Sequence, residues 1–225
     1  MKGKIICIEG TDGSGKQTQT NLLFNYLKEK GINVIRQSFP NYEYDSSVPV
    51  RQYLSGEFGE TADCLDAYQA SILFSVDRLL TYNKFLKQHY ENGGYIVFDR
   101  YVSSNMIHQA GKIRNEVERN KYLEWLDDLE YGKLKLPRPD KIIFLDVPVE
   151  VSKKLANARE SLKNKSKKDI HEQDLTHLQK AHDCGEYVAK KFGWEIIKCN
   201  KDDKSLYSID EIFDKILKKI NLTNL

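Results

Sequence analysis

The chain has 225 residues, of which 40% are apolar and 30% are charged. A disordered chain would combine low hydrophobicity with high net charge, whereas the formal charge here is only +2 and 22 residues are tyrosine or phenylalanine. The composition therefore argues against disordered, fibrous and membrane-spanning classes, and the weak net charge favours neither nucleic acid nor a membrane as the main partner. We expect a single domain over residues 1–225.

The cysteines are scattered and form no CxxC pair, so they indicate neither a disulfide framework nor a zinc site. Reduced thiols in a cytoplasmic protein are the simplest interpretation. The first apolar run, Ile5 to Ile8, is interrupted by Glu9 and is too short for a signal sequence, which needs ~7 to 15 apolar residues. The four cysteines are Cys7, Cys64, Cys184 and Cys199.

Five short runs rich in β-branched residues alternate with longer stretches of helical period. Near-continuous hydrophobicity predicts strands buried on both faces, as in a parallel sheet covered by helices. The sequence therefore predicts a doubly wound α/β fold with a five-stranded parallel sheet. The expected strands are Lys4–Glu9, Ile32–Phe39, Tyr95–Asp99, Lys141–Val147 and Trp194–Cys199, and the expected helices are Lys16–Lys30, Thr61–Glu91, Asn115–Tyr131 and Glu172–Phe192, with glycines 31, 93, 94 and 193 at helix stops.

Two connections look functional. Pro40 to Glu60 is long for a loop and rich in Ser, Tyr and charge, and Lys163 to Lys168 is a basic run. Each follows a strand, on the side where ligands bind in open α/β sheets.

A glycine loop, GTDGSGKQ, lies directly between the first strand and the first helix and fits the pattern GxxxxGK. Its glycines let backbone amides surround phosphate oxygens, and the helix N-terminus adds partial positive charge. The alternative is an ordinary glycine-rich turn without a ligand, but the position between the first strand and the first helix favours a triphosphate site. The expected ATP-binding residues are Gly10, Gly13, Ser14, Gly15, Lys16, Gln17 and Thr18.

The third strand ends in Asp99-Arg100-Tyr101, at the same sheet edge as the glycine loop. Asp99 can hold or orient hydrated Mg²⁺, and Arg100 can bind a phosphate through two hydrogen bonds. A structural ion pair that closes the strand is the alternative for these two residues.

Four motifs together resemble the thymidylate kinase family. They are the loop GTDGSGK, the DRY tripeptide, the Phe39-Pro40 pair after the second strand and the helical segment 74–78, FSVDR. The resemblance extends from Lys4 to about Cys199, and the order of the motifs is more specific than any one of them. It implies a P-loop kinase fold with a mobile lid, transfer of the ATP γ-phosphoryl group to dTMP with Mg²⁺, and a homodimer.

The resemblance also implies roles for individual residues. Asp12 matches a carboxylate that faces the deoxyribose 3′-hydroxyl, Arg100 an arginine on the acceptor phosphate, and Asp99 belongs to the metal and phosphoryl region. Phe74 matches a ring that stacks on thymine, and Arg78 a side chain that hydrogen-bonds its carbonyl edge. Positions i and i+4 share a helix face, so these last two can act together.

Further residues complete the expected acceptor site. Tyr42 matches an aromatic near the deoxyribose, and Ser104-Asn105 a polar pair near the base, so Asn105 can read the pyrimidine edge. By itself, Phe74 would instead be assigned to the core. The remaining expected contacts are Phe39, Pro40, and His108 or Gln109, although either of the last two is equally compatible with an exposed position.

Two positions and one segment depart from the family pattern. Gln17 replaces the Ser/Thr whose hydroxyl ligands Mg²⁺, which leaves Gln17 and Asp99 as metal candidates, and Asn41 stands where many relatives carry an arginine. The expected lid, residues 158–174, is rich in lysine. The cations expected to compensate are Arg51 and, in the lid, Arg159, Lys163, Lys165, Lys167 and Lys168, although most of the lysines are equally explained as a solvated face.

The sequence favours a dTMP kinase and leaves two alternatives. One is a related P-loop kinase acting on another pyrimidine nucleotide or on a deoxynucleoside, which would need a general base for the 5′-hydroxyl. The other is a nucleotide-binding protein without catalysis, suggested by Gln17 and Asn41 and disfavoured by Asp12, Lys16 and the DRY motif.

Overall fold

The computed structural model describes residues 2–162, 175–202 and 205–220, apart from the side chains of 156–162 and 175. Within it, five parallel strands form one sheet in the order β2-β3-β1-β4-β5. The expected strands are confirmed, with bounds Ile5–Glu9 (β1), Val34–Ser38 (β2), Tyr95–Asp99 (β3), Lys141–Asp146 (β4) and Glu195–Lys198 (β5).

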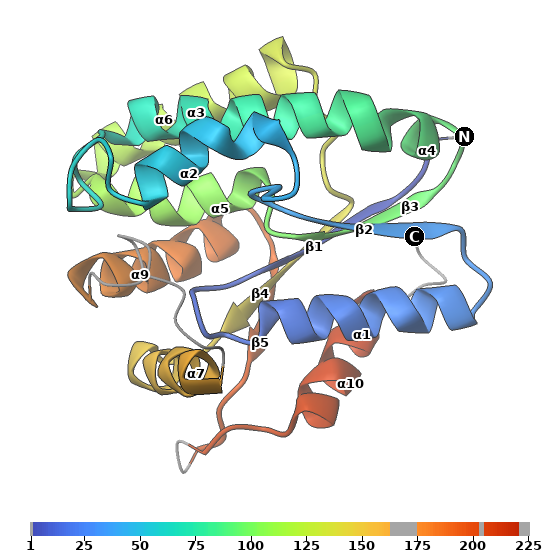
Figure 1. Cartoon of the computed structure of the whole chain (residues 1–225). Coiled ribbons are helices and arrows are strands. Elements are labelled where there is room, and N and C mark those ends of the chain that lie inside the picture. The colour runs from blue at the N-terminus through green and yellow to red at the C-terminus, as the bar shows by residue number, and fades with distance from the viewer. Residues whose placement is uncertain (1, 163–174, 203–204, 221–225) are drawn as a thin grey trace.

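Both faces of the sheet are buried, because alternate residues of each strand point to opposite sides. Ile5 and Cys7 belong to the core under α3 (Ala67–Thr81), α5 (Val102–His108), α6 (Glu116–Asp127) and α9 (Leu175–Lys191). Ile6 and Ile8 belong to the core under α1 (Lys16–Glu29) and α10 (Ile209–Ile220). Figure 1 shows the two helical layers on either side of the strands. The near-continuous apolar runs seen in the sequence follow from this double burial.

The long helices lie where the sequence predicts, except that the helix expected from Thr61 begins at Ala67, because residues 61–65 form turns before the Asp66 N-cap. Glycines 31, 93 and 193 follow them with positive φ, as expected of helix stops. Two helices continue through π-helical turns, Tyr82–Leu86 and Asp128–Lys133. The bounds are Lys16–Glu29 (α1), Ala67–Thr81 (α3), Lys87–Glu91 (α4), Glu116–Asp127 (α6) and Leu175–Lys191 (α9).

Four α-helices in the described ranges were not expected: Val48–Leu54 (α2), Val102–His108 (α5), Val149–Leu162 (α7) and Ile209–Ile220 (α10). The interpretation of residues 40–60 as one long loop was therefore wrong. Pro49 lies in the first turn of α2, where its fixed φ is favourable, and Val50, Tyr53 and Leu54 pack against α3. Short helices of this kind are stabilised by packing, which a sequence pattern of seven residues hardly shows.

Most of the expected lid segment lies outside the described residues, so the structure does not test it. Its first five residues, 158–162, end α7, and residues 163–174 lie outside the described residues, as do Lys163, Lys165, Lys167 and Lys168. The side chain of Arg159 is also not described. In the described part of the chain, none of the helices combines the length and apolar character that crossing a membrane requires.

Candidate active site

The glycine loop joins β1 to α1 in the predicted context of strand, loop and helix. Gly13 and Gly15 have φ of 81° and 83°, and a Cβ on Gly13 would lie 2.0 Å from the carbonyl oxygen of Ser152. Only glycine therefore fits at Gly13 without moving α7. The first turn of α1 contains no acidic residue, so the helix N-terminus keeps its positive end for an external anion.

Two cations share one carboxylate at the floor of this loop. Asp12 accepts hydrogen bonds from Arg100 and, at 3.2 Å, from Nζ of Lys16, which also donates to the carbonyl oxygen of Thr11. Burial acts to raise the pKa of Asp12, but the charges of Arg100 and Lys16 outweigh burial and hold the pKa well below its usual value. Asp12 is therefore ionised at neutral pH and orients both cations.

Glu9 is a site residue that the sequence analysis missed. It ends β1 and is fully buried, and its carboxylate accepts hydrogen bonds from the backbone N–H of Tyr101 and the hydroxyls of Ser103 and Ser104, at 2.7 to 3.0 Å. These bonds hold the turn in which Arg100 adopts a φ of 70°, a conformation that costs a non-glycine residue about 1 kcal/mol or more. Burial raises the pKa of Glu9 in spite of the nearby Arg100 charge.

Asp99 ends β3 beside the loop, and its side chain offers an acceptor for a cation. Ser38 donates to Oδ2 at 3.5 Å, whereas Oδ1 is buried without a hydrogen-bond partner among the described residues. A buried, unpartnered carboxylate oxygen facing a phosphate site fits hydrated Mg²⁺, which prefers hard oxygen ligands. Gln17 and Thr18, in the first turn of α1, are exposed and line the same cavity.

A second pocket region lies between α3 and α5. Phe74 is half-buried there, with its ring edge-on to Tyr53 at a centroid distance of 6.3 Å, so it belongs both to a small core cluster and to the cavity wall. Asn105 is buried and donates to the carbonyl oxygen of Ser71 at 3.5 Å. Tyr42 is 55% exposed at the cavity mouth.

Glu130 pairs with Arg78, a contact that no pattern in the sequence indicated. Arg78 is 1% exposed and Glu130 fully buried, and the guanidinium donates to both carboxylate oxygens. Ser75 donates to the same carboxylate at 2.6 Å. Glu130 lies in the π-helical turn after α6, and 52 residues separate it from Arg78. The Glu130 carboxylate therefore fixes the orientation of the Arg78 guanidinium at the cavity wall.

His108 and Gln109 are buried rather than exposed, and both line the cavity. Arg100 donates to Nε2 of His108 at 2.9 Å, which requires this nitrogen to be unprotonated. Burial and the charge of Arg100 lower the pKa of His108 well below its usual value, which agrees with a neutral ring.

These regions form one cavity of about 660 Å³, within the usual range for ligand sites. Arg51 and Gly10 are the expected residues in the described part of the chain that do not line it: Arg51 lies on α2 and pairs with Asp45 at 3.8 Å. Beyond the glycine loop, the cavity is bounded by an apolar set that the sequence analysis missed: Val147, Leu155, Cys199, Leu206, Tyr207, Ile209 and Ile212.

The glycine loop and the Asp-Arg turn lie at one edge of a parallel sheet, and one cavity connects them to the pocket between α3 and α5. This arrangement is that of a P-loop kinase. The comparisons with known proteins agree. A family model described as thymidylate kinase matches residues 8–206. The chain belongs to the thymidylate kinase family.

Relatives of this family align over most of both chains. A probable thymidylate kinase from Thermococcus onnurineus is 34% identical over 68% of this chain and 71% of its own. The thymidylate kinase of Plasmodium falciparum is 30% identical over 81% and 79% of the two chains. A solved structure of thymidylate kinase from Candida albicans, 21% identical, covers 99% of this chain and 93% of its own with a TM-score of 0.73, which supports the fold.

We expect Glu130→Met to lower the free energy of unfolding by about 3–5 kcal/mol, because it leaves the buried Arg78 charge without its partner. The double variant Arg78→Met/Glu130→Met should recover a large part of that loss. Chemical denaturation of the two single variants and the double variant gives the coupling energy. Glu124→Met, on the exposed face of α6, is the matched control and should change stability by less than about 0.5 kcal/mol. Additive effects in the double variant would contradict this assignment.

Proposed function

We propose that the protein transfers the γ-phosphoryl group of ATP to dTMP, giving ADP and dTDP. The observation that carries this proposal is the single cavity that joins the glycine loop to the pocket of Phe74, Arg78 and Asn105. A donor triphosphate at the loop and an acceptor nucleotide in the pocket would meet at Arg100. Membership of the thymidylate kinase family supports the choice of dTMP.

The chemistry needs no covalent intermediate, because an acceptor phosphate is already a nucleophile. Lys16 would bind the terminal phosphates of the donor and Arg100 the acceptor phosphate. Asp12 keeps both cations close together and, with its low pKa, remains a hydrogen-bond acceptor for the sugar hydroxyl. The residues would thus act by aligning two phosphates and by spreading negative charge in the transition state.

Mg²⁺ would be held by Asp99 from β3 and by Gln17 from the start of α1, directly or through water. When bound, the ion would neutralise charge on the donor phosphates. Among the residues that the structure describes, Oδ1 of Asp99 has no hydrogen-bond partner, which supports its part in this proposal. Thr18 is a poor substitute for a hydroxyl at Gln17, since one residue turns the helix by about 100°.

The acceptor base would stack on Phe74 and be read by Arg78 and Asn105. Because Glu130 occupies the inner side of the Arg78 guanidinium, the remaining donors can face a pyrimidine carbonyl. Tyr42, Phe39, Pro40 and Ser104 would shape the sugar side, with His108 and Gln109 near Arg100. The apolar set beyond the glycine loop would receive the donor base.

Residues 158–174 are proposed as a lid whose cations, Arg159 and the lysines, close over the phosphates. Most of this segment lies outside the described residues, so the support is its composition and its place after β4. We also propose that residues 1–225 act as one domain, in the cytoplasm. The four cysteines, all free, are compatible with a reducing compartment.

A homodimer would form through α3. Tyr68, Ile72, Val76 and Leu80 are spaced by four residues on one face of this helix and are 38 to 45% exposed, which makes an apolar stripe. Sedimentation equilibrium should give a molecular mass twice that of the monomer, and the Val76→Asp variant should have the mass of a single chain. A dimer that persists in Val76→Asp would exclude this face.

The test of the function is a panel of acceptors, dTMP, dUMP, UMP, dCMP and dGMP, with ATP and Mg²⁺ in a coupled assay for ADP. We expect dTMP to exceed dGMP by about 100-fold or more in kcat/KM, because a site with buried polar groups rejects a base that leaves them unpaired. Lys16→Ala should reduce turnover by at least about 100-fold. Turnover with none of the acceptors would favour a binding protein, and preference for another base would favour a related kinase.

Gln17→Thr should lower the Mg²⁺ concentration needed for half-maximal activity, because it restores a hydroxyl ligand in the first turn of α1. Asn25→Thr, on the exposed face of the same helix, is the matched control. The measurement is a Mg²⁺ titration of activity at saturating nucleotides. If the half-maximal concentration stays the same or rises, Gln17 does not limit metal binding.

A further inference from the structure

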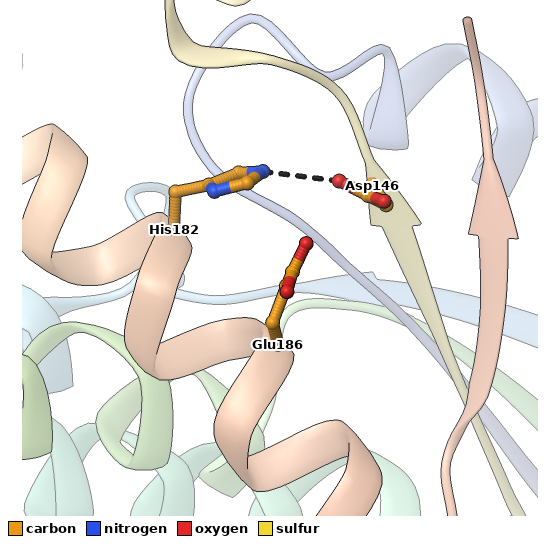
Figure 2. Close-up of side chains that lie close together, drawn as sticks. All are labelled: Asp146, His182 and Glu186. Carbon is orange, nitrogen blue, oxygen red and sulfur yellow. Dashed lines mark hydrogen bonds and ion pairs between the residues drawn. The ribbon is translucent and has the colours of Figure 1, made fainter.

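Three side chains with metal-ligating atoms meet where α9 crosses the end of β4, next to the cavity of the proposed kinase site but outside its lining. Asp146 is the last residue of β4, and His182 and Glu186 are one turn apart on α9. Nε2 of His182 lies 3.0 Å from Oδ1 of Asp146, and one ligand atom from each of the three residues lies within 4.8 Å of the others. Figure 2 shows the Glu186 carboxylate aimed toward the gap between the other two.

Tight packing of the backbone holds this arrangement. A Cβ on Gly185 would lie 2.6 Å from the ring of Phe144, so α9 approaches β4 closely between the two helical ligands. Phe144 and Asp146 point to the same face of the sheet, because they are two residues apart. The side chains of Asp146 and His182 are only 12% and 13% exposed, and that of Glu186 is 38% exposed. The side chains of Asp146 and His182 are therefore held in place by packing, whereas the Glu186 side chain can change its conformation.

We propose that Asp146, His182 and Glu186 form a binding site for a divalent transition-metal ion of the zinc type. Three protein ligands with one open position are a common zinc arrangement. Metal–ligand bonds of about 2.0 to 2.1 Å place tetrahedral ligand atoms about 3.3 Å apart, close to the present His182–Asp146 separation. Glu186 would complete the triangle by a side-chain adjustment at the surface.

The ligand set selects the kind of ion. An imidazole nitrogen suits zinc, nickel or copper, whereas Mg²⁺ and Ca²⁺ prefer oxygen ligands alone. The two carboxylates balance the charge of a divalent ion. Glu186 at present pairs with Lys190 at 3.0 Å, and because Lys190 is 67% exposed, its ammonium group can return to water when the carboxylate turns toward an ion.

A carboxylate also lies near the other ring nitrogen of the histidine. Nδ1 of His182 is 3.7 Å from Oδ1 of Asp183, which is beyond hydrogen-bond distance, and this oxygen accepts a hydrogen bond from Gln179 at 2.8 Å. Asp183 therefore adds negative charge near the histidine, and an N–H donation of the kind usual in metal-bound histidines would need a side-chain adjustment. Nε2 of the neutral imidazole would bind the ion, with the single ring proton on Nδ1; where the ring is doubly protonated, its Nε2 proton would leave to solvent. None of these four residues lines the kinase cavity, so the proposal does not rest on the proposed function.

The test is calorimetric titration of the full chain, free of any histidine tag and of nucleotide, with Zn²⁺, together with the absorbance of its Co²⁺ complex. We expect one ion per chain and a raised melting temperature. Glu186→Gln should weaken binding by more than about 100-fold, because it removes one of the three ligands. Glu29→Gln, an exposed carboxylate on α1, and Asp99→Asn should bind as the unmodified chain does.

Failure of the unmodified chain to bind one Zn²⁺ would overturn the proposal and leave an ordinary His182–Asp146 ion pair. So would binding that survives Glu186→Gln, or binding lost in Asp99→Asn, because the ion would then lie elsewhere. His182→Gln should also abolish binding. If it destabilises the fold, Glu186→Gln still decides, since its ion pair with Lys190 lies at the surface.

Discussion

The carboxylate of Glu9 is the constraint on which the active-site cavity depends. It stands at the last position of β1, directly before the glycine loop, and accepts hydrogen bonds from the turn after β3 and from the start of α5. One buried group therefore fixes two loops relative to each other. Its removal from water is unfavourable, and hydrogen bonds from three donors, the Tyr101 N–H and the hydroxyls of Ser103 and Ser104, offset that cost.

Ion pairs with Asp12 then orient the two cationic side chains of the site, Arg100 and Lys16. Arg100, held in its unusual backbone conformation by the same turn, meets Asp12 from the glycine loop, and Lys16 meets the same carboxylate from α1. The cations are thereby placed before a phosphate arrives, which is the kind of preorganisation that phosphoryl transfer needs. The pocket region between α3 and α5 has a similar arrangement, in which the buried Glu130 carboxylate pairs with Arg78.

The candidate site was largely predictable where a motif is contiguous. GTDGSGK and DRY each follow a strand, so the parallel sheet had to bring them together at one edge. Glu130 was not predictable, because its contact with Arg78 spans 52 residues and a π-helical turn in a polar stretch. Arg51 was expected on a long loop and lies instead on α2, which packs on α3, where it is outside the cavity lining and pairs with Asp45 at the surface.

The sequence by itself determined the α/β class, the five parallel strands and the phosphate loop, since these depend on local hydrophobic runs and on glycines at fixed spacing. Only the tertiary structure decided which carboxylates stand behind the cations, that His108 is buried beside Arg100, and that Asp146 meets His182 and Glu186. These are contacts between distant segments. They depend on how α5, α6 and α9 pack on the sheet, and no local pattern encodes a packing distance.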